Sequence, residues 1–243
     1  MATLASKTVN GQLVYYDAAY PHRWLDARGP DVVKWLEEGQ ATPYAAANNL
    51  AGCTSTIVEA GAGDTTIANV AGATGGQILI TTAAADNDGA NIQLNGESFY
   101  FASKWPAYFG IRFKSDEATQ DDFLFGWCIT DTDLLGAMTD GIYFRKVDGA
   151  TSVAFVAEKG SVEAAVAGVQ TFTANTFYVY EIVFDGDYVT AYIDGTLVAS
   201  IAATNLSFPN TEYLTPSLHY LSGEAPVNTA TIDWIRAIQI QTT

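Results

Sequence analysis

Short runs of alternating apolar and polar residues, separated by turn residues, fill the chain from about residue 75 to its end. In the clearest run, 107–114, three apolar side chains alternate with other residues and so share one face of a strand: Phe109, Ile111 and Phe113. Turn dipeptides divide the runs, among them Asp148-Gly149, Asp185-Gly186 and Asp194-Gly195. The expected strands are 77–82, 91–94, 98–101, 107–114, 123–129, 142–146, 153–158, 162–166, 177–184, 188–193, 197–201, 217–221 and 232–241, with Asn95-Gly96 as a hairpin signal. No helical pattern lies between them, so the sequence predicts an all-β, two-sheet antiparallel sandwich rather than a parallel sheet with crossover helices.

The first 74 residues have a different pattern. Gly29-Pro30-Asp31 has the composition of a helix start, because proline suits the first turn and an aspartate favours the positive end of a helix. Four apolar residues follow at a spacing that fits one helix face: Val32, Val33, Trp35 and Leu36. We therefore expect one short helix near residues 30–38, about two turns long and too short to be stable alone.

The segment 41–76 is small and polar, with weak strand patterns at 56–59 and 66–70. The predicted organisation is thus an N-terminal arm, residues 1–74, followed by a β-sandwich domain, residues 75–243. Because its helix is marginal, the arm is expected to pack on the sandwich or on a neighbouring copy of the chain.

Composition narrows the functional classes. The 243 residues are 49% hydrophobic but only 16% charged, which favours a β protein with large apolar faces. No stretch approaches the ~20 apolar residues of a membrane span, and the N-terminus lacks a signal-peptide pattern, so no membrane partner is expected and the chain is expected to fold where it is made. A formal charge of −16 repels phosphate backbones, so no nucleic-acid partner is expected. Cys53 and Cys128 form no metal or disulfide motif; buried thiols are the simplest expectation, and a bridge between them stays open.

Two segments resemble the concanavalin A-like, or laminin G-like, jelly rolls. Residues 180–199 read Tyr-Glu-Ile-Val-Phe-Asp-Gly-Asp-Tyr-Val-Thr-Ala-Tyr-Ile-Asp-Gly-Thr-Leu-Val-Ala, which is similar to the strand and Asp-Gly hairpin of that family. Residues 230–239, Ala-Thr-Ile-Asp-Trp-Ile-Arg-Ala-Ile-Gln, are similar to its closing strand. The resemblance covers about the last 170 residues and implies a jelly-roll sandwich.

A narrower resemblance, spread over nearly the whole chain, is to tailed-phage structural proteins that carry such a domain. It rests on residues 20–24, 29–33, 58–63, 80–82, 86–89, 109–112, 129–133 and 139–145. It implies a non-enzymatic virion protein on the capsid exterior, made in the host cytoplasm, that decorates or cements the head. Its partners would be the major capsid protein and further copies of itself, a trimer among the options. The expected contact residues lie in the arm: Tyr20, Trp24, Trp35 and Leu36.

Catalytic motifs are missing from the sequence. Retaining glycosidases on jelly rolls place two carboxylates about 5 Å apart through a Glu-x-Asp-x-x-Glu run on one strand, and no such run occurs. Lyase-type jelly rolls need a Gln-x-His motif, which neither His22 nor His219 belongs to. A Gly-x-Ser-x-Gly elbow and a phosphate-binding glycine loop are absent as well. The chain is therefore predicted not to be an enzyme.

Two binding functions stay open. No cofactor is expected, and calcium stays open because two acidic turns place oxygen ligands two residues apart. The aspartates of these turns are Asp86, Asp88, Asp131 and Asp133. Neither turn is an EF-hand, and both also fit simple Asx-turns. The alternative function is a carbohydrate-binding, lectin-like adhesion module with surface glycans as partners. Its candidate residue is Trp105, an aromatic at the start of a strand.

Overall fold

The computed structural model describes residues 3–39, 49–61 and 63–242. All strand pairs among them are antiparallel. Within these ranges every regular element is a strand, and no helix is long and apolar enough to cross a membrane. The predicted all-β class is confirmed.

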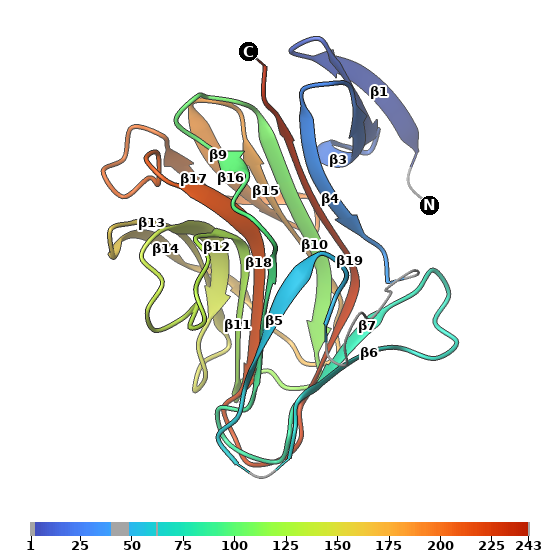
Figure 1. Ribbon diagram of the computed structural model, residues 1–243, viewed down its shortest axis with the longest axis vertical. Coiled ribbons are helices and arrows are strands. Elements are labelled where there is room, and N and C mark those ends of the chain that lie inside the picture. The colour runs from blue at the N-terminus through green and yellow to red at the C-terminus, as the bar shows by residue number, and fades with distance from the viewer. Residues whose placement is uncertain (1–2, 40–48, 62, 243) are drawn as a thin grey trace.

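Two eight-stranded sheets form the body of the molecule (Figure 1). Sheet I has the order β17 (Thr196–Ala202), β16 (Tyr188–Ile193), β15 (Tyr178–Phe184), β10 (Ala107–Ser115), β19 (Thr229–Ile240), β7 (Ile78–Thr81) and β6 (Thr66–Asn69), and β4 (Val32–Glu37) also pairs with β19. Sheet II has the order β14 (Val162–Thr171), β13 (Ser152–Lys159), β12 (Gly141–Lys146), β11 (Asp121–Cys128), β18 (Tyr213–Ser222), β8 (Gly89–Leu94) and β5 (Cys53–Val58), and β9 (Phe99–Tyr100) also pairs with β18. A third, N-terminal sheet contains β1 (Leu4–Val9), β2 (Gln12–Asp17) and β3 (Tyr20–Arg28).

The core lies between sheets I and II and follows from the period-two patterns. Alternate residues of β10 and β11 point inward, so their rings meet: Phe113 lies 5.1 Å from both Phe123 and Phe125, centroid to centroid. Burying each such side chain contributes about 1.5–3 kcal/mol. Two inward tyrosines, Tyr180 and Tyr220, have hydroxyls that hydrogen-bond to Gln170 and Ser115. The sandwich therefore has a dense aromatic interior.

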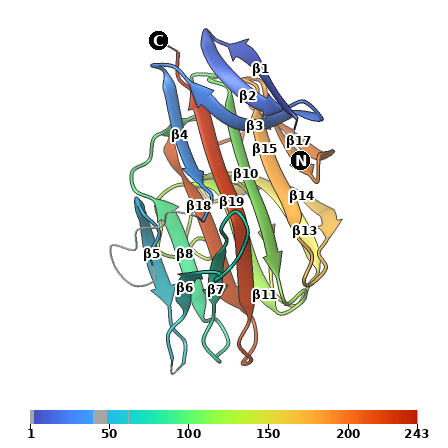
Figure 2. The same cartoon turned by 90° about the vertical axis from the view of Figure 1, so that its right-hand side faces the viewer.

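The N-terminal sheet packs on the outer face of sheet I, across β10 and β15 (Figure 2). Trp24 of β3 is 4% exposed and stacks near Tyr108, and Ile238 and Ile240 complete the cluster. Beside it, the Arg23 guanidinium makes two hydrogen bonds of 2.8 and 2.7 Å to the buried Glu181. This segment is thus held by its own chain.

The predicted helix near residues 30–38 is wrong: these residues contain strand β4, which pairs with Ile235–Ile240 of β19. Its alternate side chains pack into two different hydrophobic clusters. Val33 and Trp35 pack on the core between the sheets, whereas Val32 and Leu36 pack under the N-terminal sheet. A strand buried on both faces is apolar on both sides, which imitates a short helical pattern.

The boundary at residue 75, Asn95-Gly96 and the two cysteines each have a definite place in the two sheets. The predicted division at residue 75 does not follow the sheets, because β4, β5 and β6 precede it and belong to sheets I and II. Asn95-Gly96 lies between β8 and β9, which both pair with β18 and not with each other, so it is a bend and the predicted hairpin is wrong. Cys53 and Cys128 are free thiols on opposite faces of sheet II: Cys53 faces the core and Cys128 faces outward.

Candidate functional site

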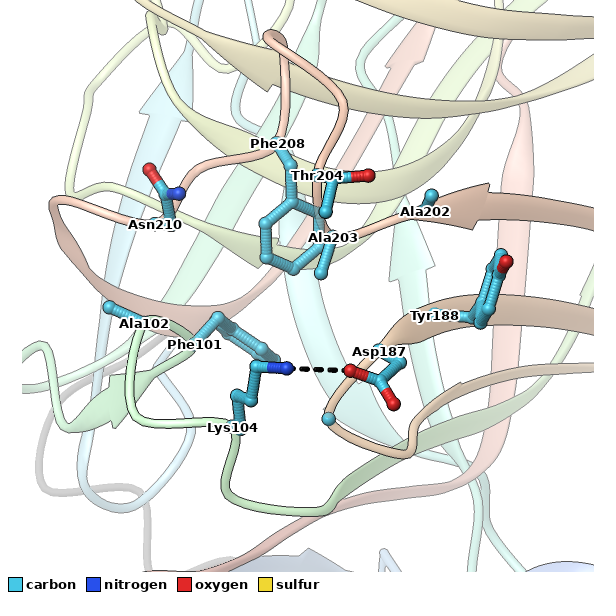
Figure 3. Close-up of a pocket in the computed structure, with 11 residues that line it drawn as sticks. Phe101, Ala102, Lys104, Asp187, Tyr188, Ala202, Ala203, Thr204, Phe208 and Asn210 are labelled. Carbon is cyan, nitrogen blue, oxygen red and sulfur yellow. Dashed lines mark hydrogen bonds and ion pairs between the residues drawn. The ribbon is translucent and has the colours of Figure 1, made fainter.

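A pocket of about 380 Å³ opens at one end of the sandwich (Figure 3). The β9–β10 connection, the β15–β16 turn and the segment after β17 surround it. We call it the rim pocket, and its residues are Phe101, Ala102, Lys104, Gly186, Asp187, Tyr188, Ala202, Ala203, Thr204, Phe208 and Asn210.

The floor of the rim pocket is aromatic and rigid. Phe101 and Phe208 are buried, and their rings meet edge to face at 6.3 Å. Phe208 also stacks on Phe184 of β15 at 5.5 Å, which ties the floor to the core. The floor is therefore a fixed part of the packed core, and ligand contacts must come from the exposed residues around it.

The mouth of the pocket is polar. The Lys104 ammonium lies 2.6 Å from an Asp187 carboxylate oxygen, and both side chains are largely exposed, so solvent screens their attraction. Tyr188 is 50% exposed beside them, and the Asn210 amide oxygen accepts a hydrogen bond from Lys159. A donor, an acceptor and an aromatic ring thus converge on one opening.

Backbone geometry brings these side chains together. Asp185 begins the β15–β16 turn, and its carboxylate accepts hydrogen bonds from the amides of Asp187 and Tyr188. Gly186 has φ +106°, and a Cβ there would lie 3.0 Å from the Lys104 carbonyl oxygen. Glycine at this position therefore lets the β9–β10 connection approach the turn.

Trp105, the predicted sugar contact, lies next to the rim pocket but does not line it. Its indole N–H donates a hydrogen bond of 2.8 Å to the Thr242 carbonyl, and its ring meets Tyr100 edge-on. Tyr100 stacks on Tyr213 at 4.5 Å, and Tyr213 is 49% exposed. We call Trp105, Tyr100 and Tyr213 the aromatic stack.

A loop, residues 129–140, covers the outer face of sheet II; we call it the strap. Its Leu134 and Met138 are buried against outward residues of β11, β12 and β13, among them Leu124 and Cys128. The amides of Asn91 and Gln93 donate to the Thr132 and Ile129 carbonyls and hold the strap down. Apolar packing therefore fills the middle of this face.

The four predicted metal ligands do not form a cluster. Asp86 is exposed, whereas Asp88 is buried and accepts a hydrogen bond from the Ala60 amide. Asp131 and Asp133 lie in the strap, where each carboxylate caps a backbone amide two or three residues on, as in Asx-turns. Among residues 3–39, 49–61 and 63–242, no three His, Cys, Asp or Glu side chains are grouped to hold a metal.

The predicted capsid contacts differ in accessibility. Trp24 is buried by its own chain, and Trp35 and Leu36 of β4 are partly buried between layers. These three side chains therefore pack mainly against other residues of the same chain. Tyr20, at the β2–β3 turn, is 36% exposed and lies under the Arg23 guanidinium.

The rim-pocket residues were missed from sequence. Lys104 and Asp187 are 83 positions apart in loops, and no local pattern joins them. The one available signal was Tyr188, a large aromatic directly after an Asp-Gly turn, where a side chain at the strand end faces solvent.

No known family profile matches the chain, and no curated protein matches it either. Solved structures do match. A protein of unknown function from Shewanella oneidensis is 11% identical, with 87% of this chain and 88% of that chain covered and a TM-score of 0.60. Bacillus licheniformis β-glucanase is 14% identical (84% and 97% covered, TM-score 0.57), and the potassium-bound carbohydrate recognition domain of Emp46p is 10% identical (79% and 90%, TM-score 0.51). Likeness at these identities extends to the fold alone, and this chain has the concanavalin A-like jelly-roll fold.

Proposed function

We propose that this chain is a non-catalytic carbohydrate-binding protein and that the rim pocket is its binding site. The observation that carries the proposal is the half-exposed Tyr188 beside the Lys104–Asp187 pair, above a buried aromatic floor. An aromatic ring stacks on the C–H face of a sugar, while an ammonium and a carboxylate bond to neighbouring hydroxyls. A concave site with few converging polar groups is the usual form of a small-ligand pocket.

The similar structures support a sugar ligand. They include a β-glucanase, a laminarinase and a carbohydrate recognition domain, so the fold carries sugar-directed functions in other proteins. Their low identity brings no residue role to this chain.

The middle of β11, on the outer face of sheet II, favours binding over hydrolysis. A retaining glycosidase needs two carboxyl groups about 5 Å apart on one face. The outward positions in the middle of β11 are Leu124, Gly126 and Cys128, and the strap packs on Leu124 and Cys128. The buried Asp122 stands at the end of that row and accepts a hydrogen bond from the Asp148 amide.

The prediction of a capsid-decorating protein on the virion exterior rests on the sequence resemblance. It stays a prediction, and glycan binding by an exposed decoration is compatible with it. The aromatic stack is the second place where a sugar could bind, because Tyr213 is as exposed as Tyr188.

A glycan array on the purified chain, followed by calorimetric titration of the hits, tests the proposal. We expect micromolar-to-millimolar affinity that falls by about two- to tenfold in Tyr188→Ala, since aromatic stacking supplies about 0.5–1.5 kcal/mol. Tyr213→Ala is the matched control, because it removes an equally exposed tyrosine outside the rim pocket. Loss in Tyr213→Ala alone would move the site to the aromatic stack, and an array without hits would refute carbohydrate binding.

A further inference from the structure

A second pocket, of about 420 Å³, lies between the N-terminal sheet and the outer face of sheet I. Its wall combines guanidinium groups, rings and apolar side chains: Tyr20, Arg23, Leu25, Arg112, Trp234 and Arg236. We call it the guanidinium pocket. β3 supplies one side, and β10 and β19 supply the other.

The pocket gathers arginines in a chain that is acidic overall. The protein has 11 basic residues and a formal charge of −16, yet three arginines line this one pocket. Each is paired with a carboxylate: Arg23 with Glu181, Arg112 with Asp233 and Arg236 with Glu38. These three carboxylate residues are not among the lining residues, where Asp17 is the acidic member. The lining therefore gathers three guanidinium groups whose charges are balanced by these partners and by Asp17, which lies 3.9 Å from Arg23.

The guanidinium groups keep hydrogen-bonding capacity beyond these pairs. A guanidinium has five N–H donors. The bonds to carboxylates use Nε and Nη2 in Arg23 and in Arg236, and Nη1 in Arg112. A planar carboxylate or sulfate can therefore be bound by the remaining donors.

Aromatic contacts hold all three guanidinium groups in place, and Arg23 lies 4.4 Å from the Tyr20 ring centre. Arg236 lies 4.4 Å from the Trp234 ring centre, and Arg112 lies 4.1 Å from that of Phe177. Such contacts reduce the freedom of the long side chains before a ligand arrives. Trp234 itself lines the pocket and is partly exposed, so an indole surface adjoins the cationic groups.

We propose that the guanidinium pocket binds an acidic monosaccharide unit, a pyranose ring that carries a carboxylate. The arginines would bind the carboxylate, and Trp234 and Leu25 would contact the ring. The volume suits one such unit, because small-molecule pockets begin at about 300 Å³. This proposal shares no residue with the rim pocket and stands or falls independently of it.

The proposal is tested by titrating the full chain with glucuronate, glucose and inorganic sulfate and measuring each affinity from the chemical-shift changes of the protein. We expect glucuronate to bind at least about tenfold more tightly than either glucose or sulfate, since only glucuronate offers both charge and ring. Binding should weaken in about 0.5 M NaCl, where the Debye length is near 4 Å. Equal affinity for glucose, or equal affinity for sulfate, would overturn the proposal.

Arg112→Gln should weaken glucuronate binding by about tenfold or more. Arg145→Gln is the matched control, because Arg145 is also paired with a carboxylate, Glu163, but lies on sheet II. Equal losses in both variants would overturn the site. If Arg112→Gln unfolds the protein, Trp234→Leu takes its place as the test variant. It must lower the affinity for glucuronate and leave the affinity of rim-pocket ligands unchanged. Unchanged glucuronate affinity would refute the ring contact.

Discussion

Lys146 and Asp121 form an ion pair with both side chains fully buried. The Lys146 ammonium donates to the backbone and the carboxylate of Asp121, and burial raises the pKa of that carboxyl group while Lys146 opposes the rise. Removing one partner leaves a buried charge without compensation. We expect Lys146→Met to lower the free energy of unfolding by about 3–5 kcal/mol, as measured by urea denaturation.

The double variant Lys146→Met/Asp121→Asn is the control for this pair. It removes both charges and should recover most of the loss, because replacing both members of a buried pair is often nearly neutral. A double variant no more stable than Lys146→Met would show that packing of the lysine stem, rather than charge, sets the cost.

His219 makes stability depend on acid pH. It is buried on β18, its Nδ1 is hydrogen-bonded to the Asn91 amide oxygen, and burial lowers its pKa to about 3. In the unfolded chain its pKa is about 6.5, so between these values the unfolded state binds the extra proton. The contribution of His219 is therefore complete above about pH 6.5 and is lost as pH falls toward about 3.

Replacing His219 should reduce this loss. In His219→Gln, we expect the fall in unfolding free energy between about pH 7 and pH 4.5 to be smaller than in the wild type by about 2 kcal/mol. Urea denaturation at both values measures it. An identical fall in both proteins would place the acid sensitivity in other groups.

At the scale of elements, the N-terminal sheet depends on one buried carboxylate. Glu181 of β15 is fully buried and accepts hydrogen bonds from Arg23 of β3 and from the Tyr108 hydroxyl. Despite this burial, its pKa is lowered, because Arg23 and His22 favour the charged form. The sheet therefore supplies the positive charge that Glu181 needs.

Arg23→Met should remove that charge and cost about 3–5 kcal/mol of unfolding free energy, with faster hydrogen exchange throughout β1, β2 and β3. Arg28→Met is the control at the end of the same strand, since Arg28 is 72% exposed and should cost less than about 0.5 kcal/mol. Equal effects in the two variants would contradict a specific role for the Arg23–Glu181 contact.

The comparison of sequence with structure is clearest for β4 and β10. Along β10, Phe109, Ile111 and Phe113 alternate with Gly110, Arg112 and Lys114, so the pattern predicted a strand directly. β4 has apolar residues on both faces because the N-terminal sheet forms a third layer over sheet I. No local pattern in the sequence predicts that layer. The rim pocket was missed for a related reason, because Lys104 and Asp187 meet only after both sheets have formed.

At the scale of the whole molecule, the two sheets have different outer coverings. The N-terminal sheet covers part of sheet I and leaves the guanidinium pocket beside it, whereas the strap covers the middle of sheet II. The rim pocket lies at one end of the sandwich, between the β9–β10 connection and the β15–β16 turn. The outer faces of both sheets are thus partly used for packing, and ligand sites are expected at the edges of these coverings.

The two cysteines can report on these coverings separately. Burial raises the pKa of Cys53 to about 12 and raises that of Cys128 as well, so neither thiol should react with a disulfide reagent in the folded protein, and both should react in denaturant. Cys128 lies beneath Leu134 of the strap, whereas Cys53 lies in the core between the sheets.

Leu134→Ala should loosen the strap and increase the labelling rate of Cys128 by about tenfold or more while leaving that of Cys53 unchanged. Mass spectrometry after timed alkylation measures both rates. If the labelling rates of both cysteines increased together, the strap would open only with the whole sandwich. It would then be part of the core rather than a separate covering.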